Sequence, residues 1–288
     1  MEMPKAIAAL FCFAFGACVG SFVNVAAYRV PREISLTAPR SFCPQCRRAI
    51  PFWANVPILA YIGLRGRCIA CGAAIPFRYF LTELALATVA AYLYLHFPPA
   101  DALARFALCA ALFAAALIDY DWRVIPNAIT LPGIPIGLFA GALMIPETGW
   151  LSALAGVAIG AGFLLLTGWV YTLLRGMEGV GMGDVWLLGM IGGFLGVAGV
   201  MFTLFAGSLF GSIGGIAFAL SGGPPGPPEE IVPEAIAEVT GAGRESETVA
   251  GSEATLLQTA VPFGPFLALA AAIFALFQPQ LAHWYFSH

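Results

Sequence analysis

Long apolar runs alternate with short polar connections along most of this 288-residue chain. The runs cover residues 6–27, 79–97, 102–118, 128–146, 150–174, 184–198, 199–220 and 261–282. Most of them approach the roughly 20 residues that a helix needs to cross a bilayer, and none alternates strictly as a barrel strand does. The pattern predicts an all-α polytopic membrane protein with about eight transmembrane helices. Because the stretch 184–220 is rich in glycine, it could instead form one span and a re-entrant segment.

Composition agrees with this class. The chain is 60% hydrophobic and only 10% charged, with a mean hydropathy of +0.88, which excludes an ordinary soluble surface. The net charge is −3, and no basic patch with interleaved aromatic residues is present. Membrane lipid is therefore an expected partner, and nucleic acid is not.

Basic residues predict the orientation of the helices. Eight arginines follow the first apolar run, namely Arg29, Arg32, Arg40, Arg47, Arg48, Arg65, Arg67 and Arg78. Because cytoplasmic loops carry the excess of basic residues, this loop is expected in the cytoplasm and the N-terminus on the outer side of the membrane. Counting eight spans from there leaves only Lys5 and Arg105 of the 13 basic residues on the outer side.

Five regions are expected along the chain. They are a first transmembrane helix (1–28), a cytoplasmic loop domain (29–78), a transmembrane core (79–221), an insertion (222–258) and a last transmembrane helix (259–288). The insertion opens with prolines and contains seven of the 16 acidic residues. Such a composition cannot bury enough apolar surface to order itself, so a flexible cytoplasmic segment is predicted there.

Two acids at the ends of apolar runs are the candidate catalytic residues. Asp184 follows Gly181-Met182-Gly183, where missing β-carbons would let a substrate chain approach closely. Asp119 ends another apolar run, and the span count places both acids at the cytoplasmic end of their helices. Asp121 is the rival of Asp119, but two residues further on it faces elsewhere on a helix. The plainer interpretation is that Asp184 only caps its helix and Asp119 only marks the membrane boundary.

A pair of close carboxylates can hydrolyse a peptide bond. One acts as the base that activates water, and the other, protonated, acts on the carbonyl oxygen. Asp119 lies near the C-terminal end of its helix, where the helix dipole disfavours negative charge, whereas Asp184 opens a helix, where that charge is favoured. The hypothesis is therefore that Asp119 is the protonated partner and Asp184 is the base.

Two Cys-x2-Cys pairs in the arginine-rich loop predict a metal site. Their four thiolates, from Cys43, Cys46, Cys68 and Cys71, can close a tetrahedral zinc site. Disulfides are the alternative, which a reducing cytoplasm disfavours. Since no ligand position is left open, the zinc is expected to hold the loop together rather than to catalyse a reaction.

Taken together, these motifs resemble the type IV prepilin leader peptidases of bacteria, a family of membrane-embedded aspartic proteases. The resemblance covers almost the whole chain apart from 222–258. It rests on the two cysteine pairs and on segments 20–31, 55–61 with 65–68, 119–127, 181–184 and 262–267. Two features depart from the family pattern. Trp186 replaces a common lysine, and the insertion is longer than expected.

The resemblance implies an activity and its partners. The expected substrates are type IV prepilins and type II secretion pseudopilins, whose short basic leader is removed after a glycine and before a phenylalanine. Many members also methylate the new terminal amine with S-adenosylmethionine. By the family pattern, Asp119 and Asp184 are the catalytic acids, and the four cysteines hold zinc. The resemblance also implies a multi-pass protein of the bacterial inner membrane, with its N-terminus in the periplasm and its active site facing the cytoplasm.

Two other classes of function remain open at this point. In a transporter, intramembrane acids and glycine-rich helices would carry protons or metal ions. In an assembly scaffold, the zinc loop would dock secretion components and the acids would be dispensable. A transporter fits the composition but gives no reason for the motif at residues 181–184 together with that at 125–127. A scaffold explains the cysteines and leaves the acids unexplained. The sequence suggests no role for Glu83, a further acid inside the second apolar run.

Overall fold

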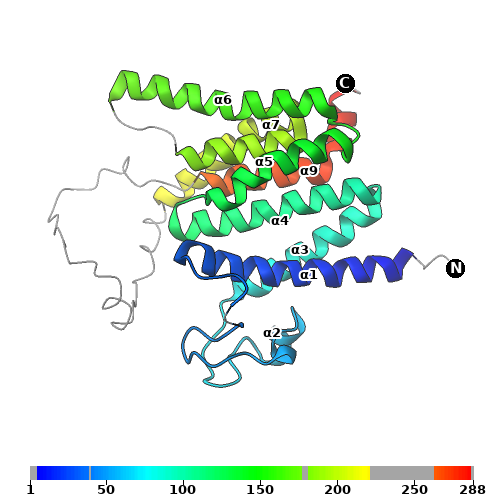
Figure 1. Cartoon of the computed structure of the whole chain (residues 1–288), viewed down its shortest axis with the longest axis vertical. Coiled ribbons are helices and arrows are strands. Elements are labelled where there is room, and N and C mark those ends of the chain that lie inside the picture. The colour runs from blue at the N-terminus through cyan, green and yellow to red at the C-terminus, as the bar shows by residue number, and fades with distance from the viewer. Residues whose placement is uncertain (1–4, 39, 177–180, 221–262, 287–288) are drawn as a thin grey trace.

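The computed structural model describes residues 5–38, 40–176, 181–220 and 263–286, and helices dominate this part of the chain (Figure 1). The long helices are α1 (Lys5–Arg29), α3 (Phe77–His96), α4 (Pro99–Trp122), α5 (Asn127–Leu143), α6 (Gly149–Arg175), α7 (Met182–Leu220) and α9 (Gly264–Phe286). The loop after α1 holds the short helices η1 (Val30–Arg32), η2 (Phe52–Asn55) and α2 (Leu59–Gly63). The predicted insertion 222–258 lies outside the described residues.

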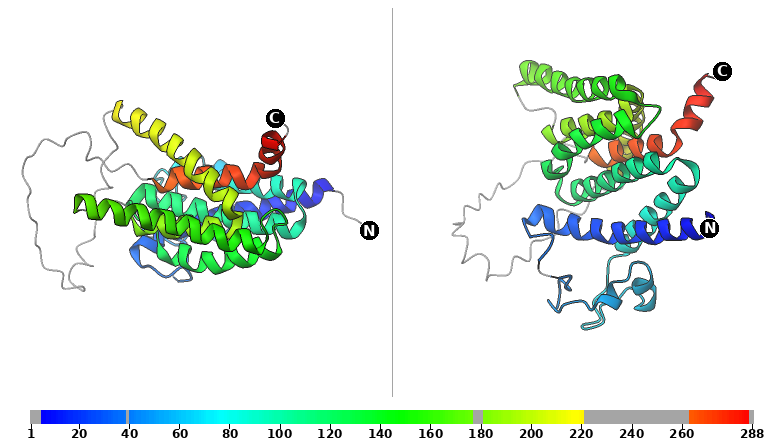
Figure 2. Two further views of the ribbon diagram at one scale, coloured as in Figure 1. Left: turned by 90° about the horizontal axis from the view of Figure 1, so that it is seen from above. Right: turned by 45° about the vertical axis from the view of Figure 1, so that its right-hand side comes forward.

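The long helices lie roughly side by side, with α6 along one edge and α1 along the opposite edge (Figures 1 and 2). α7 contacts α5, α6 and α9, while α1 packs mainly on α3. α4 joins the two groups, because it contacts α9 on one side and α1 and α3 on the other. The loop with α2 lies beyond α1, outside the helical layers (Figure 1).

A close approach between α1 and α3 depends on glycine. A β-carbon added at Gly16 would lie 2.5 Å from the carbonyl oxygen of Leu86, and one added at Gly20 would lie 2.7 Å from the Cα of Glu83. Because both neighbours are backbone atoms, a larger residue would push the two helices apart. Small residues at such crossings are typical of helices packed within membranes.

α7 is interrupted at Gly196, whose backbone angles of φ 66° and ψ −165° are not helical. Both ends of α7 lie on the left of Figure 1, so its two arms run in opposite directions. Polar side chains near the start of α6 bind the backbone groups freed by the break. Ser152 Oγ accepts from the Val197 N–H at 3.2 Å, and Thr148 donates to the Phe194 carbonyl at 3.1 Å. The break lies close to the predicted boundary between residues 198 and 199.

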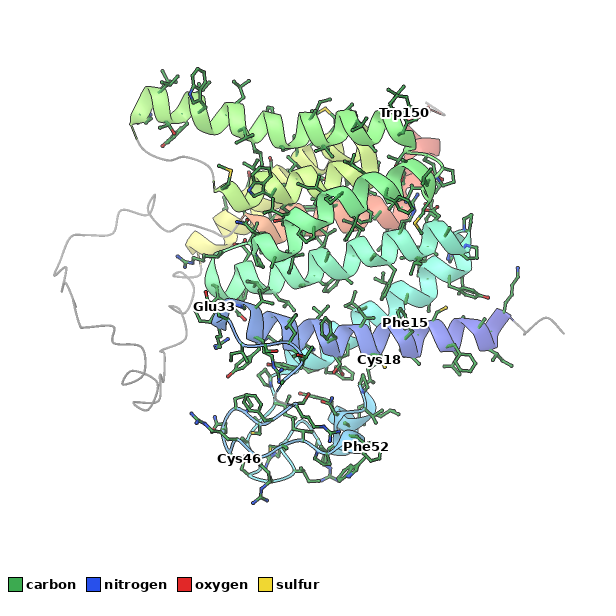
Figure 3. All side chains as sticks on the ribbon, in the orientation of Figure 1. Phe15, Cys18, Glu33, Cys46, Phe52 and Trp150 are labelled. Carbon is green, nitrogen blue, oxygen red and sulfur yellow. The ribbon has the colours of Figure 1, made fainter. Side chains whose placement is uncertain are left out.

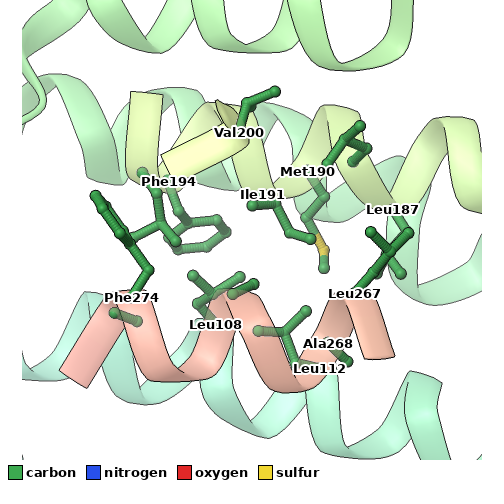
Figure 4. Packing of buried hydrophobic residues seen from close by; sticks show 14 of the residues in the cluster. Leu108, Leu112, Leu187, Met190, Ile191, Phe194, Val200, Leu267, Ala268 and Phe274 are labelled. Atoms are coloured by element: carbon green, nitrogen blue, oxygen red, sulfur yellow. The ribbon is translucent and has the colours of Figure 1, made fainter. Parts of the chain in front are cut away.

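The main core is formed where α4, α7 and α9 meet. Leu108 and Leu112 of α4 face Leu187 and Ile191 of α7, and α9 contributes residues such as Leu267 (Figure 4). A second cluster joins α1, α3 and α4. This packing fixes the ends of α4, α7 and α9 relative to one another. A functional site formed by several helix ends requires such fixed positions.

The structure confirms a helical membrane protein for the residues it describes. Four of the described helical segments are long and apolar enough to cross a membrane, namely Lys5–Arg32, Pro99–Trp122, Gly149–Arg175 and Met182–Ile216. Shorter apolar helices occupy Asn127–Leu143 and Gly264–Gln280. The count of eight transmembrane helices stays a prediction.

Candidate functional site

Asp119 lies in the last turn of α4 and is only 6% exposed. The helix ends just after it, because Arg123 adopts a left-handed conformation with φ 56° and donates its N–H to the Asp119 carbonyl at 2.8 Å. Pro126, which cannot continue a helix, follows three residues later. The acid is therefore held at a helix end but withdrawn from solvent.

Asp184 lies in the first turn of α7. Its backbone N–H donates to the carbonyl of Gly181 at 3.1 Å. Its Oδ1 atom is buried and has no hydrogen-bond partner among the described residues. A buried carboxylate oxygen without a partner is costly, so this oxygen is available to a proton, a water molecule or a substrate.

The ends of α4, α7 and α9 bring the two acids together. A β-carbon on Gly183 would lie 2.9 Å from Cβ of Ile125, and one on Gly264 would lie 2.5 Å from Oδ2 of Asp119 and 2.9 Å from Cδ1 of Ile125. The backbone N–H of Gly264 also interacts with the Asp119 carboxylate. The two carboxylates are near enough for their negative charges to interact.

Asp121, the alternative candidate to Asp119, forms an ion pair with Arg78. Both of its carboxylate oxygens accept from Nη1 of Arg78, at 2.6 and 2.7 Å. This ion pair links the end of α4 to the first turn of α3. Asp121 therefore has a structural partner, whereas the described structure gives Asp184 Oδ1 none.

Glu83, for which the sequence suggested no role, connects α3 to the loop between α1 and α3 by a hydrogen bond. Its Oε2 accepts the backbone N–H of Ile58 at 2.7 Å, and the Ser21 hydroxyl is within hydrogen-bonding reach. Ile58 has a φ of 63°, an uncommon angle for a branched residue. The carboxylate stabilises this strained turn at the point where α2 begins.

The structure brings the four predicted metal ligands into one cluster. The sulfur atoms of Cys43, Cys46, Cys68 and Cys71 all lie within 4.8 Å of one another, and those of Cys43 and Cys71 are 3.9 Å apart. The four cysteines are free thiols rather than disulfides. Four converging sulfur ligands fit a metal ion that prefers tetrahedral thiolate coordination.

The two cysteine pairs have matching backbone geometry. Residues 42 and 49 form an isolated bridge around the first pair, and residues 67 and 74 form one around the second. The residue after each pair, Arg47 or Gly72, has a positive φ. The backbone N–H groups of Cys71 and Ala70 lower the pKa of the Cys68 thiol to about 6. Burial and the neighbouring thiols raise the pKa of the Cys71 thiol to about 11, so the thiolate, the form that binds metal, is favoured at Cys68 and disfavoured at Cys71.

Ile125 and Gly264 are site residues whose roles the sequence did not reveal. Both lie in segments that resemble the peptidase family, but an apolar side chain and a glycine carry no chemical signal of their own. The placement of Gly264 between Pro262 and Pro265 was the only hint of a constrained backbone. Trp186 is half-buried, and nothing in the described structure explains why it replaces a lysine.

Two family models match successive parts of the chain. Residues 14–97 match the bacterial peptidase A24 N-terminal domain, and residues 106–216 match the type IV leader peptidase family. The first segment contains the four cysteines, and the second contains both aspartates. No solved structure matches the chain significantly.

Several curated relatives share the name prepilin leader peptidase/N-methyltransferase. The one from Burkholderia pseudomallei is 38% identical over 67% of this chain and 71% of its own length. The one from Myxococcus xanthus is 30% identical over 95% of this chain and 91% of its own. The Pseudomonas aeruginosa protein is 31% identical over 94% and 90%, respectively.

Proposed function

Because the chain belongs to the type IV leader peptidase family of bacteria, we propose that it removes the basic leader of type IV prepilins and type II secretion pseudopilins. The cut falls after a glycine and before a phenylalanine, on the cytoplasmic side of the inner membrane. The chain crosses that membrane eight times, with its N-terminus in the periplasm. Members named both peptidase and N-methyltransferase support a second activity, in which the new terminal amine is methylated with S-adenosylmethionine as donor.

The convergence of Asp119 and Asp184 is the observation that carries the peptidase proposal. Two carboxylates that share one proton supply both a base and an acid. The base takes a proton from water, which attacks the carbonyl carbon of the scissile bond. The acid protonates the carbonyl oxygen. The C–N bond then breaks as the base gives its proton to the peptide nitrogen, and the other carboxylate takes back the hydroxyl proton as the new carboxyl group forms. Which of the two acids holds the shared proton stays a prediction.

The surroundings of the pair suit this chemistry. α4, α7 and α9 each contribute a helix end, so the acids sit on rigid elements. Among the residues that the structure describes, the atom nearest to where a β-carbon on Gly181 would lie is Asp184 Oδ2, at 3.6 Å. That leaves room for a substrate chain beside the second acid. Gly183 is different, because Ile125 fills the space of its missing side chain.

Zinc is the metal we assign to the cysteine cluster. Four thiolates with no open position hold a structural ion, whose role here is to fold the loop between α1 and α3. The two bridges and matching turns described above are the backbone scaffold of that site. The ion takes no part in peptide hydrolysis in this proposal.

Leader removal by the purified chain tests the proposal. The chain, reconstituted in nanodiscs, is incubated with a prepilin peptide that spans the leader and the start of the mature protein, and the products are weighed by mass spectrometry. We expect a single cut between glycine and phenylalanine. A matched peptide with valine in place of that glycine should stay intact. Uncut substrate with a zinc-loaded, folded chain would contradict the proposed activity.

A further inference from the structure

An exposed apolar surface lies on η2 and α2, in the loop between α1 and α3. Phe52 is 78% exposed and Leu59 is 68% exposed, and Trp53 and Ile62 are also open. A surface in contact with water rarely gathers so many large apolar side chains in one short segment. This surface therefore calls for a partner, and the position of α2 beside the long helices indicates which one.

The sequence around this surface has the pattern of a segment that enters a membrane and returns. Residues 50–64 contain no charged side chain. Arg47 and Arg48 precede the segment, Arg65 and Arg67 follow it, and all four arginines are exposed. An uncharged stretch this short does not cross a bilayer but can enter one leaflet. Arginines at both of its ends suit the anionic headgroups on one side of the membrane.

The contacts of Glu83 fix the depth of α2. Its carboxylate accepts the backbone N–H of Ile58, the residue directly before α2. Its Cα lies 2.7 Å from where a β-carbon on Gly20 would be. Gly20 precedes Arg29, the last residue of α1, by nine residues, and Glu83 follows Arg78 in α3 by five. With a rise of about 1.5 Å per residue, the start of α2 lies roughly 7–13 Å deeper than these two arginines.

This depth falls among acyl chains. Arg78 pairs with Asp121 at the end of α4, which marks a polar level. The segments Lys5–Arg32 and Pro99–Trp122 are long and apolar enough to cross a membrane, and hydrocarbon extends about 15 Å to each side of a bilayer's centre. Figures 1 and 2 agree with this depth, since α2 lies alongside the middle part of α1 rather than past its end.

Packing against α3 holds the segment in this position. The ring of Tyr61 packs on those of Phe77 and Phe80, with centroids 6.3 and 5.3 Å away. The N–H of Ile58, just ahead of α2, has the Glu83 carboxylate as its acceptor. A backbone donor without a partner would be costly in hydrocarbon. The carboxylate therefore lets the chain turn within the leaflet.

We propose that η2 and α2 form a re-entrant anchor whose apolar side chains lie among the acyl chains of the cytoplasmic leaflet. Lipid fits better than a protein partner because α1 and α3 expose further large apolar residues at the same depth, such as Phe22 and Leu81. In Figure 3, Cys46 lies nearer the C-terminal end of α1 than Phe52 does. The cysteine cluster thus stays on the aqueous side while the anchor enters the membrane.

The anchor changes the topology expected for residues 29–78, because part of this loop leaves the cytoplasm. It depends on α1 and α3 lying in the membrane and not on peptidase activity. Its test therefore needs no prepilin substrate.

Spin labels in the zinc-loaded full chain test the anchor. A genetically encoded nitroxide amino acid, which leaves the cysteines untouched, is placed at position 59, 62 or 48, and the chain is reconstituted in vesicles of phosphatidylethanolamine and phosphatidylglycerol. Relaxation by oxygen is compared with relaxation by a water-soluble nickel chelate. We expect the ratio of oxygen to nickel accessibility to be at least about tenfold higher at 59 and 62 than at the control position 48, because hydrocarbon excludes the polar chelate.

Two results would overturn the anchor. Labels at 59 and 62 that are as accessible to nickel as the label at 48 would place the segment in water. Labels that neither reagent reaches would mean that a second copy of the chain or another protein covers the surface. Zinc content equal to that of the wild type shows that each labelled loop is folded.

The native Trp53 gives a second measurement without a bulky label. Trp53→Phe keeps an apolar ring, so the difference between the wild-type and variant emission spectra reports Trp53 alone. In vesicles whose lipids carry bromine on their acyl chains, which quenches tryptophan, this difference should lose most of its intensity. An unquenched difference spectrum would contradict the insertion of η2.

Discussion

At the scale of single residues, glycines decide how close the two acids come. The sequence predicts Asp119 and Asp184 as candidate catalytic acids because an acid beside an apolar run is chemically conspicuous. It could not assign Gly264, whose role depends on α9 returning to the end of α4, a contact between segments far apart in the chain. It also gave Gly183 a role in substrate approach, whereas the structure shows that Ile125 occupies that space.

Gly264→Ala tests this packing. The new β-carbon would lie 2.5 Å from Oδ2 of Asp119, so the carboxylate must move. Displacements near 1 Å lower catalysis about a hundredfold, and we expect a loss of that order in leader removal. Gly162→Ala, in α6 with open space around it, is the control. Wild-type activity in both variants would show that Asp119 need not be held by α9.

At the scale of elements, the sequence predicted the positions of most helices. It could not predict features that depend on contacts between helices, such as the exact position of the break in α7. Apolar length was enough to locate α1, α4 and α6. The break in α7 was placed only approximately, because several glycines were equally plausible. The structure selects Gly196 since Ser152 and Thr148 satisfy the backbone groups freed there. The cysteine pairs gave the metal cluster directly, because ligand type and spacing are local properties of the chain.

Loss of one ligand should unfold the zinc loop. In Cys46→Ser, the chain keeps three thiolates, and we expect the purified protein to lose about one bound zinc per chain. Structural zinc contributes about 10–16 kcal/mol in small peptides, so the loop should also become sensitive to protease. Elemental analysis and limited proteolysis measure both effects. Cys12→Ser, on α1 outside the cluster, should retain its metal, and equal zinc in the two variants would argue against the site.

At the scale of the whole molecule, an ion cluster around a buried arginine joins the helices at the end of the bundle opposite the acids. Arg105 of α4 is fully buried. It pairs with Asp101 at 2.5 Å and with Glu147 at 2.9 Å, and donates to the Ala275 carbonyl of α9 at 2.8 Å. In the sequence Arg105 was an exception to the orientation rule. The carboxylates of Asp101 and Glu147 compensate its charge within the protein. A count of basic residues along the sequence could not reveal this pairing.

Removing this cation should destabilise the bundle. Arg105→Met leaves Asp101 buried without its partner, and breaking such a pair costs about 3–5 kcal/mol. We expect a clearly lower unfolding temperature in detergent, followed by tryptophan fluorescence. Arg175→Met, at the exposed end of α6, is the matched control. If both variants unfold at the wild-type temperature, the cluster does not hold α4 to α9.

The central claim is that Asp119 and Asp184 form one catalytic pair. The most direct measurement is leader removal from a prepilin by Asp119→Asn, Asp184→Asn and Asp121→Asn, at equal protein levels. Both variants of the pair should lose nearly all activity. Asp121→Asn, which weakens only the contact with Arg78, should keep most of it. Normal processing by either Asp119→Asn or Asp184→Asn would contradict the account.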